Sequence, residues 1–379
     1  MEVEFYKHNI GDDEQDSISK VLKSRFITTG PVTSEFENKF AKYLNKKYCV
    51  GVSSWTAGNL ITLKALDIGA GDEVITTPMS FIATSNTILH VGAKPVFVDV
   101  DYQTGNINLD LIEKAITKKT KAIIPVHLYG QMCDMKKLNN IAKKYNLIII
   151  EDCAHCIEGE RDGIKPGQLS NAALFSFYAT KNITSGEGGA IVTDDKNLYN
   201  KLKKYRMHGM SSGAEDRFNS GYKHWDMELL GYKCNMGDLQ AALLIPQLKK
   251  IEKYWRSRKT IYKQYFDMLK GLEHIALPTI LPGTKHAYHL FTIWVNQDKR
   301  DDLILYLKEK QIGITINYRA IHLLSYYRRK YNFSPGTFKE SERIGNSTIS
   351  LPFFTKIEKN EIEYVVKNIF SFFTKPNIN

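Results

Sequence analysis

Short apolar runs alternate with amphipathic stretches between residues 48 and 194, and this alternation constrains the fold more than any other feature of the chain. Runs such as residues 48–52, 147–151 and 190–193 are apolar almost throughout instead of on every second residue. Strands of that kind are buried on both faces, and strands that alternate with helices of this length form parallel sheets covered by helices. The sequence therefore predicts an α/β fold with a mostly parallel, seven-stranded sheet.

The remainder of the chain predicts a second, smaller unit. Residues 238–269 have the pattern of one long helix that can connect two domains, with Pro246 as a candidate break. The strands expected at residues 289–295, 312–318 and 347–351 alternate with helices, which is typical of a compact α+β unit. The 379 residues also exceed the length of about 250–300 at which single cores stop growing. We predict a large domain over residues 1–237, a connecting helix over 238–270 and a small C-terminal α+β domain over 271–379.

The net charge of +11 raises the question of nucleic-acid binding. The lysines come as scattered pairs, and neither a tract of five basic residues nor a known nucleic-acid motif accompanies them. The charge is therefore interpreted as a solvated surface. The apolar runs are shorter than the roughly 20 residues of a membrane helix, and the first residues lack the pattern of a signal peptide. We expect a cytoplasmic protein that binds neither nucleic acid nor membrane.

Five cysteines are present, and an odd number without a secretory signal argues against a disulfide framework. Cys153 and Cys156 form a C-x-x-C motif, which is also found in redox and zinc sites. No second pair follows at zinc-ribbon spacing, and the flanking acids and histidine suit another chemistry. The sequence therefore predicts no metal site.

Candidate reactive groups follow the predicted strands. An apolar run delivers Ser176 and, five residues later, Lys181, which a glycine-bearing loop follows. A lysine just past a buried strand end is desolvated, which favours its neutral, nucleophilic amine. Ser176 at the same strand end is placed to donate a hydrogen bond to a phosphate. This segment alone leaves open the alternative of a surface lysine in a loop.

Asp152 comes directly after another buried run, at the end of the sheet where open α/β proteins bind ligands. A carboxylate against the pyridine nitrogen of pyridoxal phosphate (PLP) keeps that nitrogen protonated, which the cofactor needs to act as an electron sink. His155 is placed to orient this carboxylate or to pack near the ring. An N-cap aspartate with a core histidine is an equal alternative.

The run that ends at Val52 leads into a predicted helix that begins near Thr56 and Ala57. Backbone amides at a helix N-terminus bind anions, so these two residues are candidates for holding a phosphate; the alternative is a turn without a ligand. Phe81 follows a further strand and is a candidate for stacking on an aromatic ring, although it also suits a core.

These pieces belong to a longer series of motifs that resembles the DegT/DnrJ/StrS-type sugar aminotransferases, which are PLP enzymes of fold type I. The motifs are SSWTAG at 53–58, GDEVITTP at 71–78, KPVFVDVD at 94–101, AIIPVHLYG at 122–130, EDCAH at 151–155, FSFYATKN at 175–182 and EGGAIVT at 187–193. The similarity extends nearly from end to end of the chain. Within the family, the chain is similar to enzymes of the UDP-4-amino-4-deoxy-arabinose and pseudaminic-acid pathways.

The resemblance implies a role for each matching residue. Lys181 would be the Schiff-base and proton-transfer residue, Asp152 the partner of the pyridine nitrogen with His155 beside it, and Phe81 the stacking ring. Thr56, Ala57 and Ser176 would hold the phosphate. Asn235 would reach the cofactor phosphate of the other subunit, which implies a homodimer with shared active sites. The implied reaction moves the amino group of glutamate to C4 of a nucleotide-linked 4-keto-6-deoxy sugar, with UDP-sugars favoured, for cell-surface glycan biosynthesis.

Two positions depart from the family pattern and bear on the substrate. Trp55 replaces a small residue, and Tyr178 replaces a frequent histidine, so both are candidates for shaping the sugar pocket. Arg319 suits a carboxylate or diphosphate, with a surface salt bridge as the alternative. Amination at C3 of a dTDP- or GDP-linked keto sugar remains open, as does a non-catalytic regulator that binds sugar nucleotides. Related C3 dehydratases carry histidine in place of the lysine, so Lys181 argues against that activity.

Overall fold

The computed structural model describes residues 1–211 and 224–374 of the chain. Its main element is a seven-stranded sheet with the strand order β1-β8-β7-β5-β4-β2-β3. The strands are β1 (Tyr48–Val52), β2 (Glu73–Thr76), β3 (Lys94–Phe97), β4 (Thr120–Ile123), β5 (Ile148–Asp152), β7 (Ala172–Ser176) and β8 (Gly189–Thr193). Only β8 runs in the direction opposite to the other six strands, so the predicted mostly parallel sheet is confirmed.

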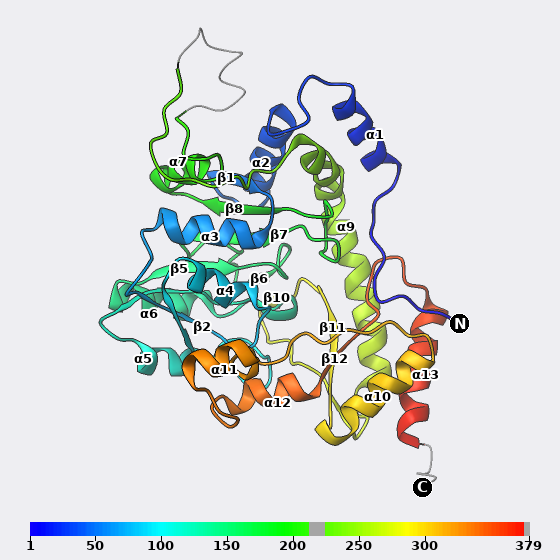
Figure 1. Cartoon of the computed structure of the whole chain (residues 1–379). Helices are drawn as coiled ribbons and strands as arrows, with labels where there is room; N and C mark the ends of the chain where they lie inside the picture. The colour runs from blue at the N-terminus through cyan, green and yellow to red at the C-terminus, as the bar shows by residue number, and fades with distance from the viewer. Residues whose placement is uncertain (212–223, 375–379) are drawn as a thin grey trace.

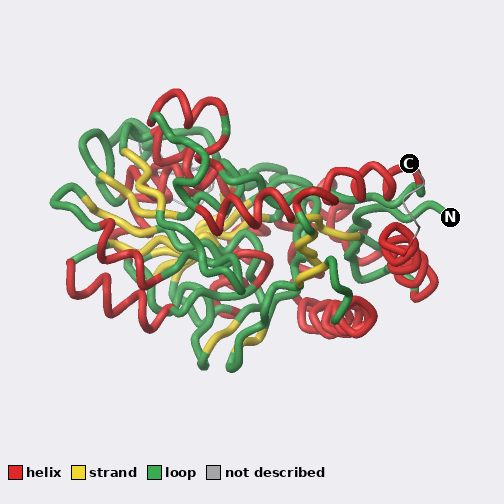
Figure 2. The backbone as a smooth tube through the Cα atoms, turned by 90° about the horizontal axis from the view of Figure 1, so that it is seen from below, coloured by secondary structure: helices red, strands yellow, loops and turns green. Residues whose placement is uncertain are grey.

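Helices cover both faces of this sheet, as Figures 1 and 2 show. One face is packed by α3 (Trp55–Ala65), α4 (Ala83–His90) and α7 (Lys196–Tyr205). The other is packed by α2 (Pro31–Tyr43) and α9 (Asp238–Leu269) near β1, and by α5 (Ile112–Ala115) and α6 (Met135–Tyr145) towards β3. Leu174 packs on the first face, whereas its neighbours Ala173 and Phe175 pack on the second. Burial on both faces explains why the strand sequences are continuously apolar.

The C-terminal unit has its own three-stranded sheet, in the order β12-β11-β9. Its strands are β9 (Ile275–Ala276), β11 (Phe291–Val295) and β12 (Thr348–Leu351), and its helices are α10 (Gln297–Glu309), α11 (Ser325–Tyr331), α12 (Lys339–Ser347) and α13 (Lys359–Thr374). The smaller elements of the chain are α1 (Asp12–Leu22), β6 (Glu160–Arg161), which pairs with β10 (Thr284–Lys285), and the 3-10 turns at Leu109–Leu111, Leu128–Gly130 and Ile321–Leu323.

The prediction of a strand at residues 312–318 is wrong. Ile312 and Thr315 each make one isolated bridge, to Val3 and to Ser350, so no ladder forms. The start of this segment bonds to the N-terminus of the chain instead: the N–H of Val3 donates to the carbonyl of Gln311, and the carbonyl of Val3 accepts the N–H of Gly313. Val3 is 1% exposed and lies in the core of the C-terminal unit, so the first residues of the chain pack there, as Figure 1 shows.

Helix α9 links the two units. It spans 32 residues without interruption, so Pro246 does not break it. Proline removes one N–H from the helix, and apolar neighbours that include Leu244 and Leu248 remain buried against the large sheet. The second half of the same helix contributes Tyr265 and Leu269 to the C-terminal core. Among the described residues, no helix has the length and apolarity that crossing a membrane requires.

Candidate active site

Asp152 is the last residue of β5 and lies at the carboxyl end of the sheet. Its side chain is 4% exposed. Oδ2 accepts a hydrogen bond from Oγ1 of Thr84 at 2.8 Å, and Oδ1 accepts one from the backbone N–H of Ala154 at 3.1 Å. Burial raises the pKa of the carboxyl, while these donors and the charge of Lys181 act in the opposite direction. The arrangement keeps a hydrogen-bonded acid in a fixed position where water is excluded.

Lys181 lies in the loop that follows β7, the strand next to β5 in the sheet. Burial lowers the pKa of its amine to about 8, and the nearby negative charge of Asp152 opposes this shift. An amine with such a pKa is partly unprotonated near neutral pH and able both to attack a carbonyl and to take up a proton. The charges of the two residues that the sequence singled out first thus act on each other.

The candidate phosphate site lies where β1 leads into α3. Ser54 caps this helix, and its side chain accepts a hydrogen bond from the N–H of Ala57 at 3.1 Å. A methyl group on Gly189 of β8 would lie 2.7 Å from the backbone of Ser54, so the glycine allows β8 to approach this turn. Thr56 is exposed and Ala57 half-buried beside it. The first turn of α3 therefore offers a hydroxyl and backbone amides, as an anion site requires.

Ser176 ends β7 and is buried. Its oxygen accepts a hydrogen bond from the N–H of Tyr178 at 3.3 Å, which leaves its own hydroxyl hydrogen free to be donated. Tyr178 itself is 48% exposed.

An aromatic group surrounds His155, which is buried just after Asp152. The ring of His155 packs on that of His289 at a centroid distance of 4.3 Å, and its Nε2 lies 3.0 Å from the hydroxyl of Tyr318. Tyr318 in turn lies 5.9 Å from the ring of Phe81, which is 56% exposed. Phe81 is therefore open to a flat ligand, whereas the histidines form the closed side of the group.

The remaining predicted residues lie in different surroundings. Asn235 is half-buried, forms a bridge with Val52 and donates through Nδ2 to Oγ1 of Thr29 at 2.6 Å. Trp55 is 6% exposed and packs in the core between α3 and the sheet; its indole N–H has no hydrogen-bond partner among the described residues. Arg319 is exposed and directly follows Tyr318.

Four residues of this group were missing from the sequence-based prediction: Thr84, Asn182, His289 and Tyr318. Tyr318 and His289 belong to the C-terminal part of the chain, and neither carries a local signal that would link it to His155. Asn182 follows Lys181 directly, so its position next to the site was available from the sequence, although its role was not.

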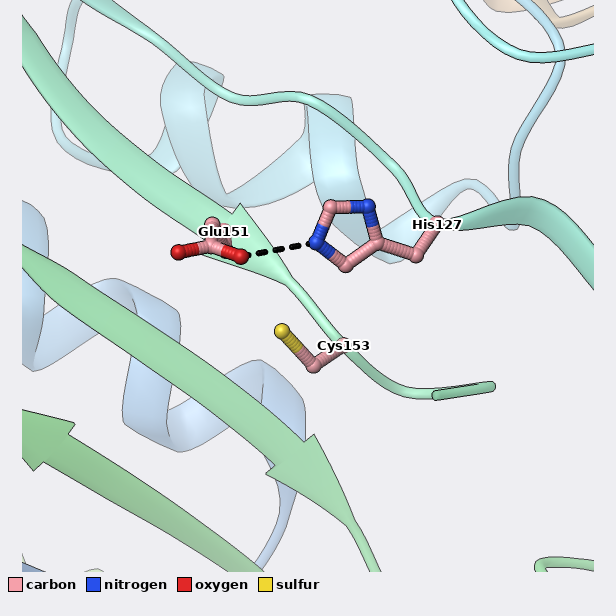
Figure 3. Close-up of side chains that lie close together, drawn as sticks. All are labelled: His127, Glu151 and Cys153. Carbon is pink, nitrogen blue, oxygen red and sulfur yellow. Dashed lines mark hydrogen bonds and ion pairs between the residues drawn. The ribbon is translucent and has the colours of Figure 1, made fainter. Parts of the chain in front are cut away.

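A second buried cluster includes the residues on either side of Asp152 in the chain. His127, Glu151 and Cys153 have their potential ligand atoms within 4.8 Å of one another, the one such triplet found among the described residues (Figure 3). Nε2 of His127 lies 2.8 Å from Oε2 of Glu151, and its Nδ1 accepts the N–H of Cys133 at 3.1 Å. The other oxygen of Glu151 accepts the N–H of Gly167. Protein hydrogen bonds therefore occupy both polar residues. Cys153 and Cys156 are buried, free thiols.

The donor set around Lys181 fits pyridoxal phosphate. The residues offer an amine of lowered pKa, a buried carboxylate, an exposed aromatic ring and a helix N-terminus with hydroxyl groups, which match the aldehyde, pyridine nitrogen, ring face and phosphate of that cofactor.

Comparison with known proteins agrees with this fit. The family model described as the DegT/DnrJ/EryC1/StrS aminotransferase family matches residues 8–370. The chain is 42% identical over 365 residues to the uncharacterized protein MJ1066 of Methanocaldococcus jannaschii, covering 95% of both chains. It is 36% identical over 366 residues to SpsC of Bacillus subtilis, a spore coat polysaccharide biosynthesis protein, covering 95% of this chain and 94% of the relative.

Solved structures give the same result. DesV of S. venezuelae, solved in complex with a ketimine intermediate, superposes with a TM-score of 0.90 at 30% identity and covers 99% of this chain and 100% of its own. PseC of Helicobacter pylori, an aminotransferase of pseudoaminic acid biosynthesis, gives 0.91 at 28% identity, with coverage of 98% and 99%. Spr1654 of Streptococcus pneumoniae in its PLP form gives 0.90 at 29% identity, with 98% of each chain covered.

The predicted fold type, cofactor and enzyme class are thereby confirmed. The protein is a PLP-dependent sugar aminotransferase with the type I fold, and the chain belongs to the DegT/DnrJ/EryC1/StrS aminotransferase family.

Proposed function

We propose that this enzyme transfers the amino group of glutamate to C4 of a nucleotide-linked 4-keto-6-deoxy sugar, with a UDP-sugar as the favoured substrate. Glutamate leaves as 2-oxoglutarate, and the keto carbon of the sugar becomes an amine. The product would enter cell-surface glycan biosynthesis, with the cytoplasm as the proposed compartment. The similarity to SpsC and PseC, whose descriptions name polysaccharide and pseudoaminic acid biosynthesis, supports this choice.

The observation that carries the proposal is the position of Lys181 in the loop after β7, next to β5, which ends at Asp152, whose charge raises the pKa of the lysine against the effect of burial. When bound, the cofactor supplies an electron sink for the carbon that exchanges its proton. Lys181 would anchor the cofactor covalently and, when released, carry that proton on Nζ. The Asp152 carboxylate would hold a proton on the pyridine nitrogen, and Thr84 would keep the carboxylate in place.

The other site residues would bind the cofactor and substrates. Thr56, Ala57 and Ser176 would bind the phosphate, Phe81 would cover one face of the ring, and His155 would lie beside it. Tyr178 and Arg319 are exposed and would face the sugar nucleotide. Trp55 would act on the sugar only indirectly, since it packs in the core under the phosphate-binding turn.

A homodimer with shared sites is part of the proposal. Asn235 would reach the cofactor phosphate of the other subunit. Large exposed apolar side chains support an extended contact, because Met227 is 57% and Leu230 82% exposed shortly before Asn235 in the chain.

The substrate is tested by incubating the enzyme with glutamate and a panel of 4-keto and 3-keto sugar nucleotides that carry uridine, thymidine or guanosine, and weighing the products. Only the UDP-4-keto sugars should gain an amino group at a substantial rate, and the Lys181→Ala variant should aminate none. Preferred amination of a 3-keto substrate linked to dTDP or GDP would replace the proposal with the C3 alternative. Turnover of none of them would overturn the proposed substrate class.

Lys181 is tested separately. Borohydride reduction of the holoenzyme followed by peptide mass mapping should place the cofactor mass on the peptide that contains Lys181. Labelling of a different lysine would overturn the assignment.

A further inference from the structure

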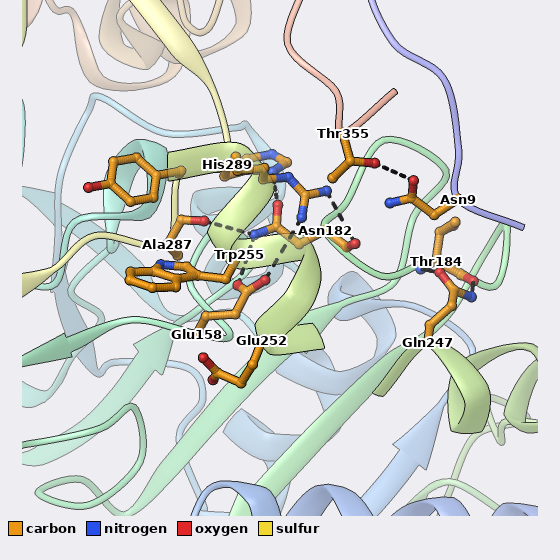
Figure 4. Close-up of polar contacts among 12 residues, drawn as sticks. Asn9, Glu158, Asn182, Thr184, Gln247, Glu252, Trp255, Ala287, His289 and Thr355 are labelled. Carbon is orange, nitrogen blue, oxygen red and sulfur yellow. Dashed lines mark hydrogen bonds and ion pairs between the residues drawn. The ribbon is translucent and has the colours of Figure 1, made fainter. Parts of the chain in front are cut away.

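Behind the lysine loop lies a buried polar network that the roles above do not use (Figure 4). Its centre is Asn182, the residue after Lys181, which is 4% exposed. Asn182 joins three distant parts of the chain through hydrogen bonds: Glu158 after β5, Arg258 of α9 and His289 before β11.

The side-chain amide of Asn182 has only one possible orientation. Its Nδ2 donates to Oε2 of Glu158 at 2.8 Å and to the backbone carbonyl of Ala287 at 3.0 Å. A carbonyl oxygen can only accept, so the nitrogen must face Ala287 whatever the protonation of Glu158. The amide oxygen is therefore turned towards Nδ1 of His289, 3.0 Å away.

This orientation determines where His289 carries its hydrogen. An amide oxygen has no hydrogen to donate, so Nδ1 of His289 must be the donor. The imidazole is neutral, because burial, with the charge of Lys181 acting in the same direction, holds its pKa well below the usual range. Nε2 of His289 is therefore left unprotonated.

The neighbouring ring, that of His155, has the opposite tautomer. Its Nδ1 accepts the backbone N–H of Tyr129 at 3.3 Å, and burial followed by the charge of Lys181 keeps its pKa low. The hydrogen is then on Nε2 and is donated to the hydroxyl of Tyr318 at 3.0 Å. Of the four ring nitrogens of His155 and His289, Nε2 of His289 is the one without a hydrogen-bond partner among the described residues.

Helix α9 holds Asn182 from the backbone side as well. Nη2 of Arg258 donates to the backbone carbonyl of Asn182 at 3.2 Å, and Nη1 lies 4.0 Å from Glu158. The amide is thus fixed at both its side chain and its main chain, as a residue that orients another group requires.

We propose that Asn182, the residue after Lys181, is a positioning residue that fixes His289 as the Nδ1–H tautomer and leaves its Nε2 as a free proton acceptor. This inference rests on the proposed function, in which Lys181 gains and loses protons. With His289 protonated at Nδ1 and His155 at Nε2, the two rings together leave one free acceptor nitrogen, and the Nε2–H of His155 is already bonded to Tyr318.

The tautomer of His289 can be measured directly, without an activity assay. Long-range proton–nitrogen NMR spectra of the holoenzyme labelled with ¹⁵N-histidine distinguish Nδ1–H from Nε2–H, and the His289→Asn variant identifies the signals by their loss. His289 should be protonated at Nδ1 and bare at Nε2, with His155 the reverse. An Nε2–H or doubly protonated His289 in the native enzyme would overturn the inference before any other variant is made.

The Asn182→Ala variant should lose the Nδ1–H form of His289. Its half-reaction with glutamate should slow by about 10- to 100-fold at saturating glutamate, the range found for residues that orient a metal-bound histidine. The control is Asn368→Ala, which removes another buried asparagine whose amide bonds only a carbonyl within α13. This control should leave the tautomer and the rate as in the native enzyme.

An unchanged tautomer in a folded Asn182→Ala enzyme would contradict the positioning role. Thermal unfolding establishes whether the variant is folded, and the native spectrum remains decisive if it is not. Failure of the proposed function is recognised independently, because peptide mapping would then place the cofactor on a lysine other than Lys181.

Discussion

The reactivity of Lys181 depends on two opposing effects at its amine. Burial lowers the pKa of the amine to about 8, and the carboxylate of Asp152 raises it. At pH 7 an amine of that pKa is unprotonated in about a tenth of the molecules, compared with roughly one in three thousand for an ordinary lysine. The balance produces a group that is nucleophilic and still basic.

The rate at which the apoenzyme combines with pyridoxal phosphate should rise with pH and level off above a midpoint near 8, because only the neutral amine attacks. Absorbance measurements across pH 6–10 would show the midpoint. A midpoint above 10 would mean that Lys181 is solvated like an ordinary lysine.

The Asp152→Asn variant should shift that midpoint downwards, because it removes the charge that raises the pKa of Lys181. Amine transfer should nevertheless fall by at least about 100-fold, since the amide cannot hold a proton on the pyridine nitrogen. The same pH series and the glutamate half-reaction measure the two effects. Thr84→Val is the matched control: it removes one hydrogen bond to Asp152 but keeps the charge, so its midpoint should move little.

The sequence was sufficient to place residues at strand ends or in the loops after them, such as Asp152, Ser176 and Lys181. Strand ends in a parallel sheet meet at one edge, so local position implies proximity. It was insufficient for Tyr318 and His289, which reach His155 from the C-terminal part of the chain. Their arrival depends on how two units pack, which no local pattern encodes.

Helix α9 is the element that holds the lysine loop. Oε1 of Gln247 accepts the N–H of Thr184 at 3.0 Å, and Nε2 donates to the carbonyl of the same residue at 2.7 Å. Three turns further along, Arg258 binds the carbonyl of Asn182. The two contacts fix the main chain immediately after Lys181, as Figure 4 shows in part.

Replacing Gln247 by leucine should release this loop. Two buried backbone groups of Thr184 lose their partners, so the free energy of unfolding should fall by about 1–3 kcal/mol, and amide hydrogen exchange should increase in residues 177–188. Gln240→Leu in the same helix is the control: its side chain caps only Gly237, so the exchange of the lysine loop should not change. Equal exchange in both variants would show that α9 does not restrain the loop.

The elements themselves were largely predictable. The bounds of α9 and β1 agree with the expected ranges, because a long helical pattern marks the first and a continuous apolar run marks the second. The strand expected at residues 312–318 failed because its alternating pattern is not matched by a continuous partner. Partners lie elsewhere in the chain, and periodicity measures only which side chains are buried.

For the whole molecule, the proposed dimer requires that two chains complete each active site. Inactive Lys181→Ala and Asn235→Ala enzymes, when mixed, unfolded and refolded together, should regain up to about a quarter of native activity, because about half of the dimers are mixed and each of these carries one intact site of two. Sites that are complete in each subunit would give no recovery from the mixture. Sedimentation of both variants would verify that each still forms a dimer.

The approach of β8 to the start of α3 has a consequence for engineering. Gly189 admits no side chain, since even a methyl group would lie 2.7 Å from the carbonyl carbon of Ser54. Mutant libraries aimed at new sugars should keep this codon fixed while they vary exposed positions such as Tyr178. In library members altered at Gly189 the start of α3 would be displaced. Their loss of activity would reveal nothing about sugar preference.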